Sequence, residues 1–469
     1  MRSLLFSSVP FLYYFLPATL LLYLVAPRRL KNAVLLLVSL VFYAWGEPRY
    51  IAVMLASVAL GYVFGLLIER FRGKRAAKVF LALSVASSLA FLVYFKYADF
   101  FITNWNAVTG FAVPLLEIAL PIGISFYTFQ ILSYTVDVYR GEVSAQKNPI
   151  DLAAYITLFP QLIAGPIVRY SDVDRQLGER THTLDKTALG IRRFVLGLAK
   201  KILIADALAA FCSDFAASGE KSVLFFWLYA VAFSLQIYFD FSGYSDMAIG
   251  LGRIFGFDFP ENFNYPFISG SITEFWRRWH ISLGSWFRDY VYIPLGGNRV
   301  SKARGLFNIF VVWMLTGFWH GASWNFIFWG LFFAVWLLAE KLWLLPYLKK
   351  AKVWNHLYVL ILVLFSFVLF ASEDMETLLF NVKGMIGLGG VPAVTAATLY
   401  YLRSYAVVFA IALVGSTPLV KRALGAIMER RFGERAVNVA EPIILTVLLL
   451  VMTGYLVDGS FSPFLYFRF

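Results

Sequence analysis

Long apolar runs divide this chain into segments that shorter polar or basic stretches separate. A helical crossing of a hydrocarbon core needs roughly 20 mainly apolar residues, so each run predicts a membrane-spanning helix. The clear runs cover about residues 5–26, 30–46, 50–69, 76–95, 117–138, 222–250, 323–345, 356–371, 399–420 and 441–458, with weaker ones near 196–215 and 306–319. We therefore expect an all-α polytopic membrane protein with about twelve transmembrane helices.

Composition supports a membrane protein. Of the 469 residues, 60% are hydrophobic, 18% aromatic and only 15% charged, whereas a soluble domain has about a quarter of its residues charged. The first run lacks a small-residue cleavage pattern and is expected to stay as an uncleaved span. We expect a single integral-membrane domain over residues 1–469, with N-terminal helices in 1–140, a catalytic core in 141–346 and C-terminal helices in 347–469.

The basic residues predict the orientation of the chain. Lysine and arginine cluster in alternate loops, and cytoplasmic loops are enriched in both, so the N-terminus is expected outside and the stretch 251–305 inside. The net charge of +13 then reflects topology and contact with anionic membrane lipids, and it does not indicate nucleic-acid binding. The single cysteine, Cys212, excludes an intramolecular disulfide and a cysteine-rich metal site, and we expect no metal ion.

Two segments are too interrupted to cross the membrane, yet too aromatic to be plain loops. Residues 149–168 contain Pro160, Gln161 and Pro166, and residues 261–298 combine polar, aromatic and glycine-rich stretches. Proline breaks a helix, and irregular backbone at membrane depth is tolerated where protein covers it or where it lines a wet cavity. We expect two re-entrant segments around a central funnel or tunnel.

Two histidines lie in the most aromatic part of the chain. His280 follows Trp279, and His320 follows Trp319 and precedes Gly321. An ionisable group within a membrane segment is a functional candidate by default, and a buried imidazole needs a polar partner. Helical spacing places the residues around His280 on one stripe, namely Trp276, Trp279, His280 and Leu283.

Charged residues near these histidines have two interpretations. Arg277, Arg278 and Arg288 suit an anionic ligand that has an apolar portion, but arginines at membrane surfaces are also ordinary interfacial anchors. Asp240 and Asp246 lie in an apolar run and must face a partner cation, the bundle interior or the membrane rim. We expect these two carboxylates to hold arginines of the following segment in a scaffold role.

Several longer motifs resemble the signature of the membrane-bound O-acyltransferase family. They are Pro160–Pro166, Phe239–Gly250, Trp276–Asn298 and Gly317–Gly321. Two early motifs, Phe42–Pro48 and Pro121–Tyr127, are similar to the bacterial branch that includes alginate and peptidoglycan O-acetyltransferases. The resemblance implies many helices around a funnel, with an intramembrane histidine where the donor and acceptor paths meet. That role falls on His320 and the family's second histidine on His280, while Gly284 stands where relatives often have serine.

The chemistry that follows needs a base. A hydroxyl that attacks a thioester carbonyl must lose its proton, and a neutral imidazole has a suitable pKa, so His320 is the candidate base. A direct acyl-histidine intermediate is equally open. Possible donors to the developing oxyanion include Asn325, Trp324, Trp319 and His280. The candidate substrate-binding residues are Trp276, Arg277, Arg278, Trp279, Arg288, Asp289, Trp319, Trp324, Asn325 and Gln161.

The resemblance implies an O-acetyltransferase of the bacterial inner membrane that binds no cofactor. Its donor would be cytoplasmic acetyl-CoA, and its acceptor an extracytoplasmic partner protein or a cell-envelope polysaccharide. One alternative is a teichoic-acid D-alanylation enzyme, whose donor is the thioester of a carrier protein. Two further alternatives are a proton-coupled transporter or flippase and a pair of histidines that only join helices.

Overall fold

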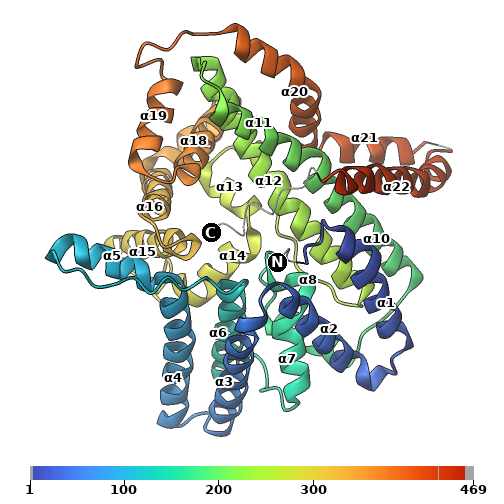
Figure 1. Cartoon of the computed structure of the whole chain (residues 1–469). Helices are drawn as coiled ribbons and strands as arrows, with labels where there is room; N and C mark the ends of the chain where they lie inside the picture. The colour runs from blue at the N-terminus through green and yellow to red at the C-terminus, as the bar shows by residue number, and fades with distance from the viewer. Residues whose placement is uncertain (1–3, 431, 460–469) are drawn as a thin grey trace. The chain divides into compact units, whose positions relative to one another are not determined.

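The computed structural model describes residues 4–430 and 432–459, and every regular element within those ranges is helical (Figure 1). The all-α prediction is therefore confirmed. Contacts group the chain into two compact units, the first formed by Met1–Phe194 and Ser245–Glu261, the second by Val195–Tyr244 and Asn262–Phe469. Two long helices, α10 and α12, continue from one unit into the other. The division into three sequential parts stays a prediction.

The first unit is built from the N-terminal helices and the segment that contains Gln161. Short π or 3-10 turns lie at the starts or ends of several of these helices. The elements are η1 (Phe11–Phe15), α1 (Leu16–Val25), η2 (Arg28–Leu30), α2 (Lys31–Gly46), η3 (Pro48–Tyr50), α3 (Ile51–Arg70), α4 (Arg75–Leu92), η4 (Val93–Tyr97), α5 (Ala98–Thr109), α6 (Ile124–Arg140), α7 (Pro149–Thr157), α8 (Phe159–Leu162), α9 (Tyr170–Gly178) and most of α10 (Leu184–Ala199).

The second unit carries both candidate histidines. Its elements are η5 (Lys200–Ala205), α11 (Asp206–Ala217), most of α12 (Val223–Ile254), η6 (Pro266–Ile268), α13 (Ile272–Arg278), α14 (Ile281–Phe287), η7 (Arg288–Tyr292), α15 (Lys302–His320), α16 (Trp324–Ala339), η8 (Glu340–Leu344), α17 (Leu345–Lys350), α18 (Trp354–Ala371), α19 (Met375–Met385), α20 (Ala396–Gly415), α21 (Leu419–Met428) and α22 (Gly433–Val457).

Eight helical stretches in the described residues are long and apolar enough to cross a membrane. They are Arg28–Gly46, Pro48–Arg70, Arg75–Thr109, Val223–Ile254, Trp324–Lys350, Trp354–Ala371, Ala396–Gly415 and Gly433–Val457, and a shorter apolar helix covers Phe11–Val25. A polytopic membrane protein is thus supported, whereas the count of about twelve is not confirmed. The remaining predicted runs fall on helices that are shorter, interrupted or less apolar.

The predicted run 117–138 was wrong at its start. Helix α6 begins only at Ile124, because Pro121 and the left-handed Gly123 (φ 76°) interrupt the backbone before it. Residues 110–120 instead follow α5 as non-helical chain. The Asp99 carboxylate fixes this segment by accepting the backbone N–H groups of Leu116 at 2.7 Å and of Glu117 at 3.0 Å.

Three helices of the first unit, α3, α4 and α6, pack against one another side by side (Figure 1). Glycines on α3 allow the close approach: a Cβ at Gly65 would lie 2.6 Å from the Tyr134 hydroxyl oxygen of α6, and one at Gly61 would lie 2.9 Å from Ile131 Cγ2. Small residues let membrane helices approach closely enough for dispersion contacts to hold them together. This packing stabilises the first unit.

A cluster of buried aromatic and aliphatic side chains forms the core of the second unit. It joins α11, α12, α13, α16, α18 and α20, with Phe225, Phe275, Trp329 and Phe367 among its members. Helices α15 and α16 form a closely packed hairpin joined by three residues. Residues of α13 and of α16 belong to this core, so the core fixes the helix that leads to His280 and the hairpin that carries His320.

Candidate active site

His320 is the last residue of α15, at the turn of the α15–α16 hairpin. Gly317, one turn before it, faces Gly330 of α16: a Cβ at Gly317 would lie 2.3 Å from the Phe326 carbonyl oxygen and 3.0 Å from the Gly330 Cα. A Cβ at Gly330 would in turn lie 2.3 Å from the Trp313 carbonyl oxygen. Only glycine fits at either position, so the two helix backbones touch beside His320.

Aromatic rings enclose the His320 imidazole, which is 7% exposed. The ring centroids of Trp329 and Phe370 lie 4.9 Å and 5.6 Å from it, each nearly perpendicular, and that of Trp319 lies at 5.0 Å. Edge-to-face packing of this kind restrains the orientation of a ring. The enclosure gives the imidazole a largely apolar setting.

His280 stands at a break between two short helices. Its backbone has φ 45° and ψ 54°, a left-handed conformation that costs a non-glycine residue about 1–3 kcal/mol unless neighbouring contacts hold it. Those contacts come from the preceding non-helical residues 262–264: Asn264 N–H donates to the Arg278 carbonyl at 2.9 Å, and Ile281 N–H donates to the Asn262 carbonyl at 3.0 Å. The predicted helical stripe through Trp276, Trp279, His280 and Leu283 is therefore wrong.

Asn262 also holds the start of α14. Its side-chain oxygen accepts the Ser282 hydroxyl at 2.9 Å and the Ser282 N–H at 3.3 Å, and the Asn262 side chain is itself buried. A single asparagine thus bonds on the C-terminal side of His280 through both backbone and side chain. Sequence reasoning did not single it out.

The two imidazoles share one neighbour. The Trp319 ring centroid lies 6.2 Å from that of His280 and 5.0 Å from that of His320, and Phe241 of α12 lies 4.7 Å from His280 on another side. The structure therefore brings both predicted histidines and Trp319 together. His280 lies outside the eight candidate spans, and burial lowers its pKa to about 3, so its imidazole is neutral at physiological pH.

Trp329, which packs on His320, and its neighbour Trp276 carry buried hydrogen-bond donors. The indole N–H groups of Trp276 and Trp329 have no acceptor among the described residues, and the two rings are 5.5 Å apart. The Asn325 side-chain N–H donates to the Phe370 carbonyl at 3.3 Å. Of these, Trp329 was missed by sequence reasoning, because one more tryptophan in an apolar run carries no distinguishing signal.

The other predicted aromatic residues divide into core and surface. Trp279 is buried in the core, stacked on Phe275 at 5.6 Å and near Phe367 at 5.1 Å. Trp324 is 51% exposed and stacks on Phe328. Trp279 therefore anchors the His280 segment in the core, whereas Trp324 lies at the surface.

The predicted arginines differ in their partners. Arg278 pairs with Glu274 at 2.8 Å, and Arg288 pairs with the adjacent Asp289 at 2.6 Å. Burial alone would raise the pKa of Glu274, but the Gly270 N–H and the Arg278 guanidinium outweigh it and lower that pKa. Arg277 is exposed and has no carboxylate partner in the described part of the chain. It is the arginine most free to meet an anionic ligand.

The expected partners of the two aspartates were wrong. Asp240 pairs with Lys201 of η5 at 2.9 Å, within a buried cluster that also contains Asp206, 2.7 Å from the same ammonium. Asp246, in the first unit, pairs with Arg193 at 2.8 Å, and Arg193 also pairs with Glu261. Both cations precede the aspartates in the chain. The scaffold interpretation fits these ion pairs, but the arginines at 277–288 take no part in them.

Gln161 lies in the first unit, where α8 follows the break at Leu158. Its side-chain N–H donates to the Tyr155 carbonyl at 2.7 Å, and its oxygen has no partner among the described residues. Both histidines lie in the second unit. A role for Gln161 in substrate binding stays a prediction.

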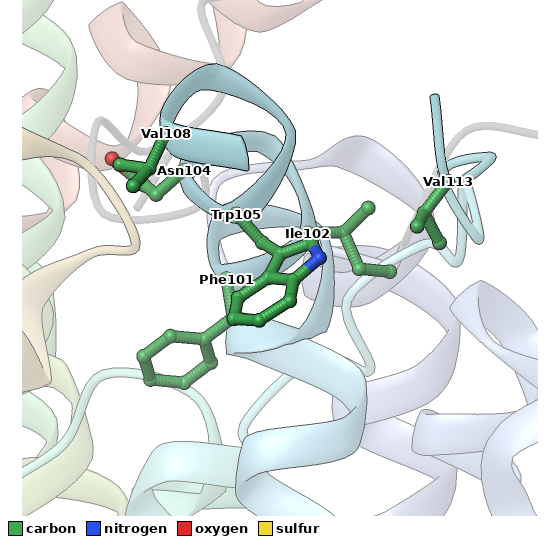
Figure 2. Close-up of a pocket in the computed structure, with 6 residues that line it drawn as sticks. All are labelled: Phe101, Ile102, Asn104, Trp105, Val108 and Val113. Atoms are coloured by element: carbon green, nitrogen blue, oxygen red, sulfur yellow. The ribbon is translucent and has the colours of Figure 1, made fainter. Parts of the chain in front are cut away.

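A cavity of about 520 Å³ is also found in the first unit, between α5 and the chain that follows it (Figure 2). Its lining is apolar apart from one asparagine and consists of Phe101, Ile102, Asn104, Trp105, Val108 and Val113. It contains no base, nucleophile or cation. We therefore assign the chemistry to the histidines.

A family model for membrane-bound O-acyltransferases matches residues 140–372, a range that includes both histidines. The chain is also 40% identical to a protein of Pseudomonas putida named "Probable alginate O-acetylase AlgI", over 99% of this chain and 100% of that protein. The chain belongs to the membrane-bound O-acyltransferase family. The resemblance of its motifs to this family is thereby confirmed, and the chain is a multi-pass membrane enzyme of the acyltransferase class.

Two further relatives of this acyltransferase differ in how much of the chain they match. A "Peptidoglycan O-acetyltransferase" of Helicobacter pylori is 35% identical over 83% of this chain and 81% of its own length. A "Teichoic acid D-alanyltransferase" of Bacillus subtilis is 33% identical over 46% of this chain and 57% of its own length. Similarity to proteins named for O-acetylation thus extends along far more of the chain.

Proposed function

We propose that this acyltransferase moves an acetyl group from cytoplasmic acetyl-CoA to a hydroxyl of a cell-envelope polysaccharide such as alginate or peptidoglycan, with the help of an extracytoplasmic partner protein. The observation that carries the proposal is the 40% identity to a protein named as an alginate O-acetylase along 99% of this chain. We place the enzyme in the bacterial inner membrane, where the coenzyme and the envelope are on opposite sides.

In this proposal His320 acts as the general base. The acceptor oxygen attacks the thioester carbonyl while the imidazole takes its proton, and the same proton then passes to the leaving thiolate, so no other reactant is needed. The aromatic enclosure of His320 favours the neutral base over the imidazolium. The unpartnered indole N–H groups of Trp276 and Trp329 are candidate donors to the oxyanion that forms on the thioester oxygen.

His280 is proposed as the second functional histidine. Its ring shares the neighbour Trp319 with His320, and its ring nitrogens bond to no other described residue. A neutral imidazole in this place can accept from or donate to a bound substrate. Arg277 is proposed to meet a phosphate of the coenzyme, because it is exposed and not neutralised by a described carboxylate, unlike Arg278 and Arg288.

The D-alanylation alternative differs in its donor, which would be a carrier-protein thioester. The shorter match to a D-alanyltransferase argues for acetylation. Sealed inside-out membrane vesicles that contain the chain separate the two, when acetyl-labelled CoA is supplied outside and label is counted on lumenal polysaccharide. The proposal predicts label with the coenzyme alone. Transfer that requires an added acyl carrier protein would contradict it.

A further inference from the structure

Glu340 is a buried carboxylate that none of the proposed chemistry uses. It is the first residue of η8, directly after α16, and its side chain is 1% exposed. A buried acid in a membrane helix marks a functional place by default, and its partner should be identified. Its partners lie at the start of α13, the helix that leads to His280.

Four hydrogen bonds reach this carboxylate. Oε1 accepts the Ile272 N–H at 2.6 Å and the Tyr358 hydroxyl of α18 at 3.2 Å. Oε2 accepts the Thr273 N–H at 2.9 Å and the Thr273 hydroxyl at 2.6 Å. Glu340 therefore joins α13 to the end of α16 and to the beginning of α18.

The remaining N-terminal donors of α13 are satisfied locally. Ser271 Oγ accepts the Glu274 N–H at 3.0 Å, and the Ser271 carbonyl accepts the Phe275 N–H at 2.9 Å. The first four N–H groups of a helix have no partner within it, so Glu340 supplies the acceptors for two of them. A helix of seven residues does not hold its shape alone in this environment, and its position depends on such external bonds.

The position of α13 determines that of His280. Only Trp279 separates the end of α13 from His280, and the left-handed backbone at His280 requires both flanking segments to be held. Asn262 holds the C-terminal side through Ile281 and Ser282. Glu340 holds the N-terminal side from the far end of α13.

From these contacts we infer that Glu340 is a positioning residue for acyl transfer: by bonding the first turn of α13 it holds His280, and the adjoining Arg277, in their working places. It does not touch the reacting atoms. The inference rests on the proposed function and adds to it the residue that sets the geometry of the second histidine.

The test compares Glu340→Gln with a matched control in vesicles of the full chain. The glutamine keeps the size of the side chain but replaces one of the two acceptor oxygens by a donor, which would face backbone N–H groups. Asp374→Asn is the control, because Asp374 also accepts an N–H group at the start of a helix, that of Thr377 at 2.7 Å, but as the exposed N-cap residue of α19, which carries neither histidine.

Acetyl transfer at varied acetyl-CoA gives the first readout. We expect Glu340→Gln to lower kcat by about thirtyfold with KM changed less than about threefold, and Asp374→Asn to stay within about twofold of the native chain. Native kcat in Glu340→Gln would overturn the inference.

Carbethoxylation of His280 by diethyl pyrocarbonate, followed by mass spectrometry, gives a readout that needs no acyl transfer. Glu340→Gln should raise the rate at His280 by at least about fivefold, because the ring leaves its buried place, and Asp374→Asn should not. An unchanged rate overturns the inference whether or not the chain transfers acetyl. Loss of transfer in the native chain with a raised carbethoxylation rate in Glu340→Gln instead contradicts the proposed function alone.

Thr273→Val provides a second test of the inference if Glu340→Gln does not fold. It removes only the 2.6 Å bond from the Thr273 hydroxyl to Glu340 and keeps the shape of the side chain. We expect kcat to fall by about threefold to fivefold in a fully folded protein, with a smaller rise in carbethoxylation at His280. Native values for both would overturn the inference.

Discussion

The two histidines of the second unit share a neighbouring ring, yet their backbones are held in opposite ways. His320 ends a regular helix and is placed by the contact of Gly317 with Gly330 inside one hairpin. His280 interrupts the helical pattern in a left-handed conformation, and residues distant in sequence hold it, namely Asn262, Asn264 and Glu340. One residue type can therefore be placed by local helix packing or by long-range hydrogen bonds, and substitutions should affect the two positions differently.

The largest expected difference comes from removing each ring. His320→Ala should lower kcat by at least about a thousandfold, since the base itself is lost, whereas His280→Ala should lower it by about ten- to a hundredfold. Steady-state transfer of acetyl label by purified, monodisperse variants gives both values. Equal losses for the two variants would remove the distinction between base and second histidine.

The hairpin should tolerate no side chain at Gly317. A Cβ there would lie 2.3 Å from a backbone oxygen of α16, so Gly317→Ala must separate the helices, at a cost of about 3 kcal/mol or more, and displace His320. Gly425→Ala is the matched control, because a Cβ at this helical glycine meets nothing within 4 Å. Thermal unfolding in detergent and turnover measure both effects. A native unfolding midpoint in Gly317→Ala would disprove the close contact.

The backbone contrast predicts effects of opposite sign for the same pair of substitutions. At position 280 glycine should be more stable than alanine by about 1 kcal/mol, because glycine adopts positive φ without strain. At position 320, in a helix, alanine should be more stable than glycine by about 0.5–1 kcal/mol. The unfolding midpoints of His280→Gly, His280→Ala, His320→Gly and His320→Ala test both predictions. The same sign at both positions would mean that the backbones do not differ as described.

The smallest expected effect concerns the arginines near His280. Arg277→Ala should raise KM for acetyl-CoA about three- to fivefold, and added salt should weaken this difference, because an exposed guanidinium is screened. Arg278→Ala is the comparison, since Glu274 already pairs with that side chain at 2.8 Å. A larger rise in KM for Arg278→Ala than for Arg277→Ala would show that Arg277 is not the arginine that contacts the phosphate.

The all-helical membrane fold could be predicted from the sequence because it depends on local pattern. Apolar length predicted the helices, and the neighbouring runs 306–319 and 323–345 lie largely in α15 and α16, on either side of the His320 turn. The helical stripe at His280 was wrong because periodicity does not report a positive φ that Asn262 and Asn264 impose from sixteen or more residues away.

Two other errors had the same origin. Asp240 pairs with Lys201, and Asp246 pairs with Arg193. These cations lie on other helical elements, so the spacing of charges along one helix does not reveal them. Helix α6 begins only after Pro121 and Gly123, two helix-breaking residues that are visible in the sequence. The predicted span 117–138 included them because it was based on the length of the apolar run alone. Glu340 had a usable signal, a single acid inside the apolar run 323–345, and it was not used.

The most direct measurement of the central claim is the amount of acetyl label that His320→Ala transfers from acetyl-CoA to polysaccharide hydroxyls, beside the unfolding midpoint of the same preparation. The account predicts transfer at least about a thousandfold below that of the native chain in a variant that still folds and unfolds cooperatively, with a midpoint lowered only by the cavity that the missing ring leaves. Substantial transfer by a folded His320→Ala would show that the acceptor proton goes elsewhere and would contradict the account.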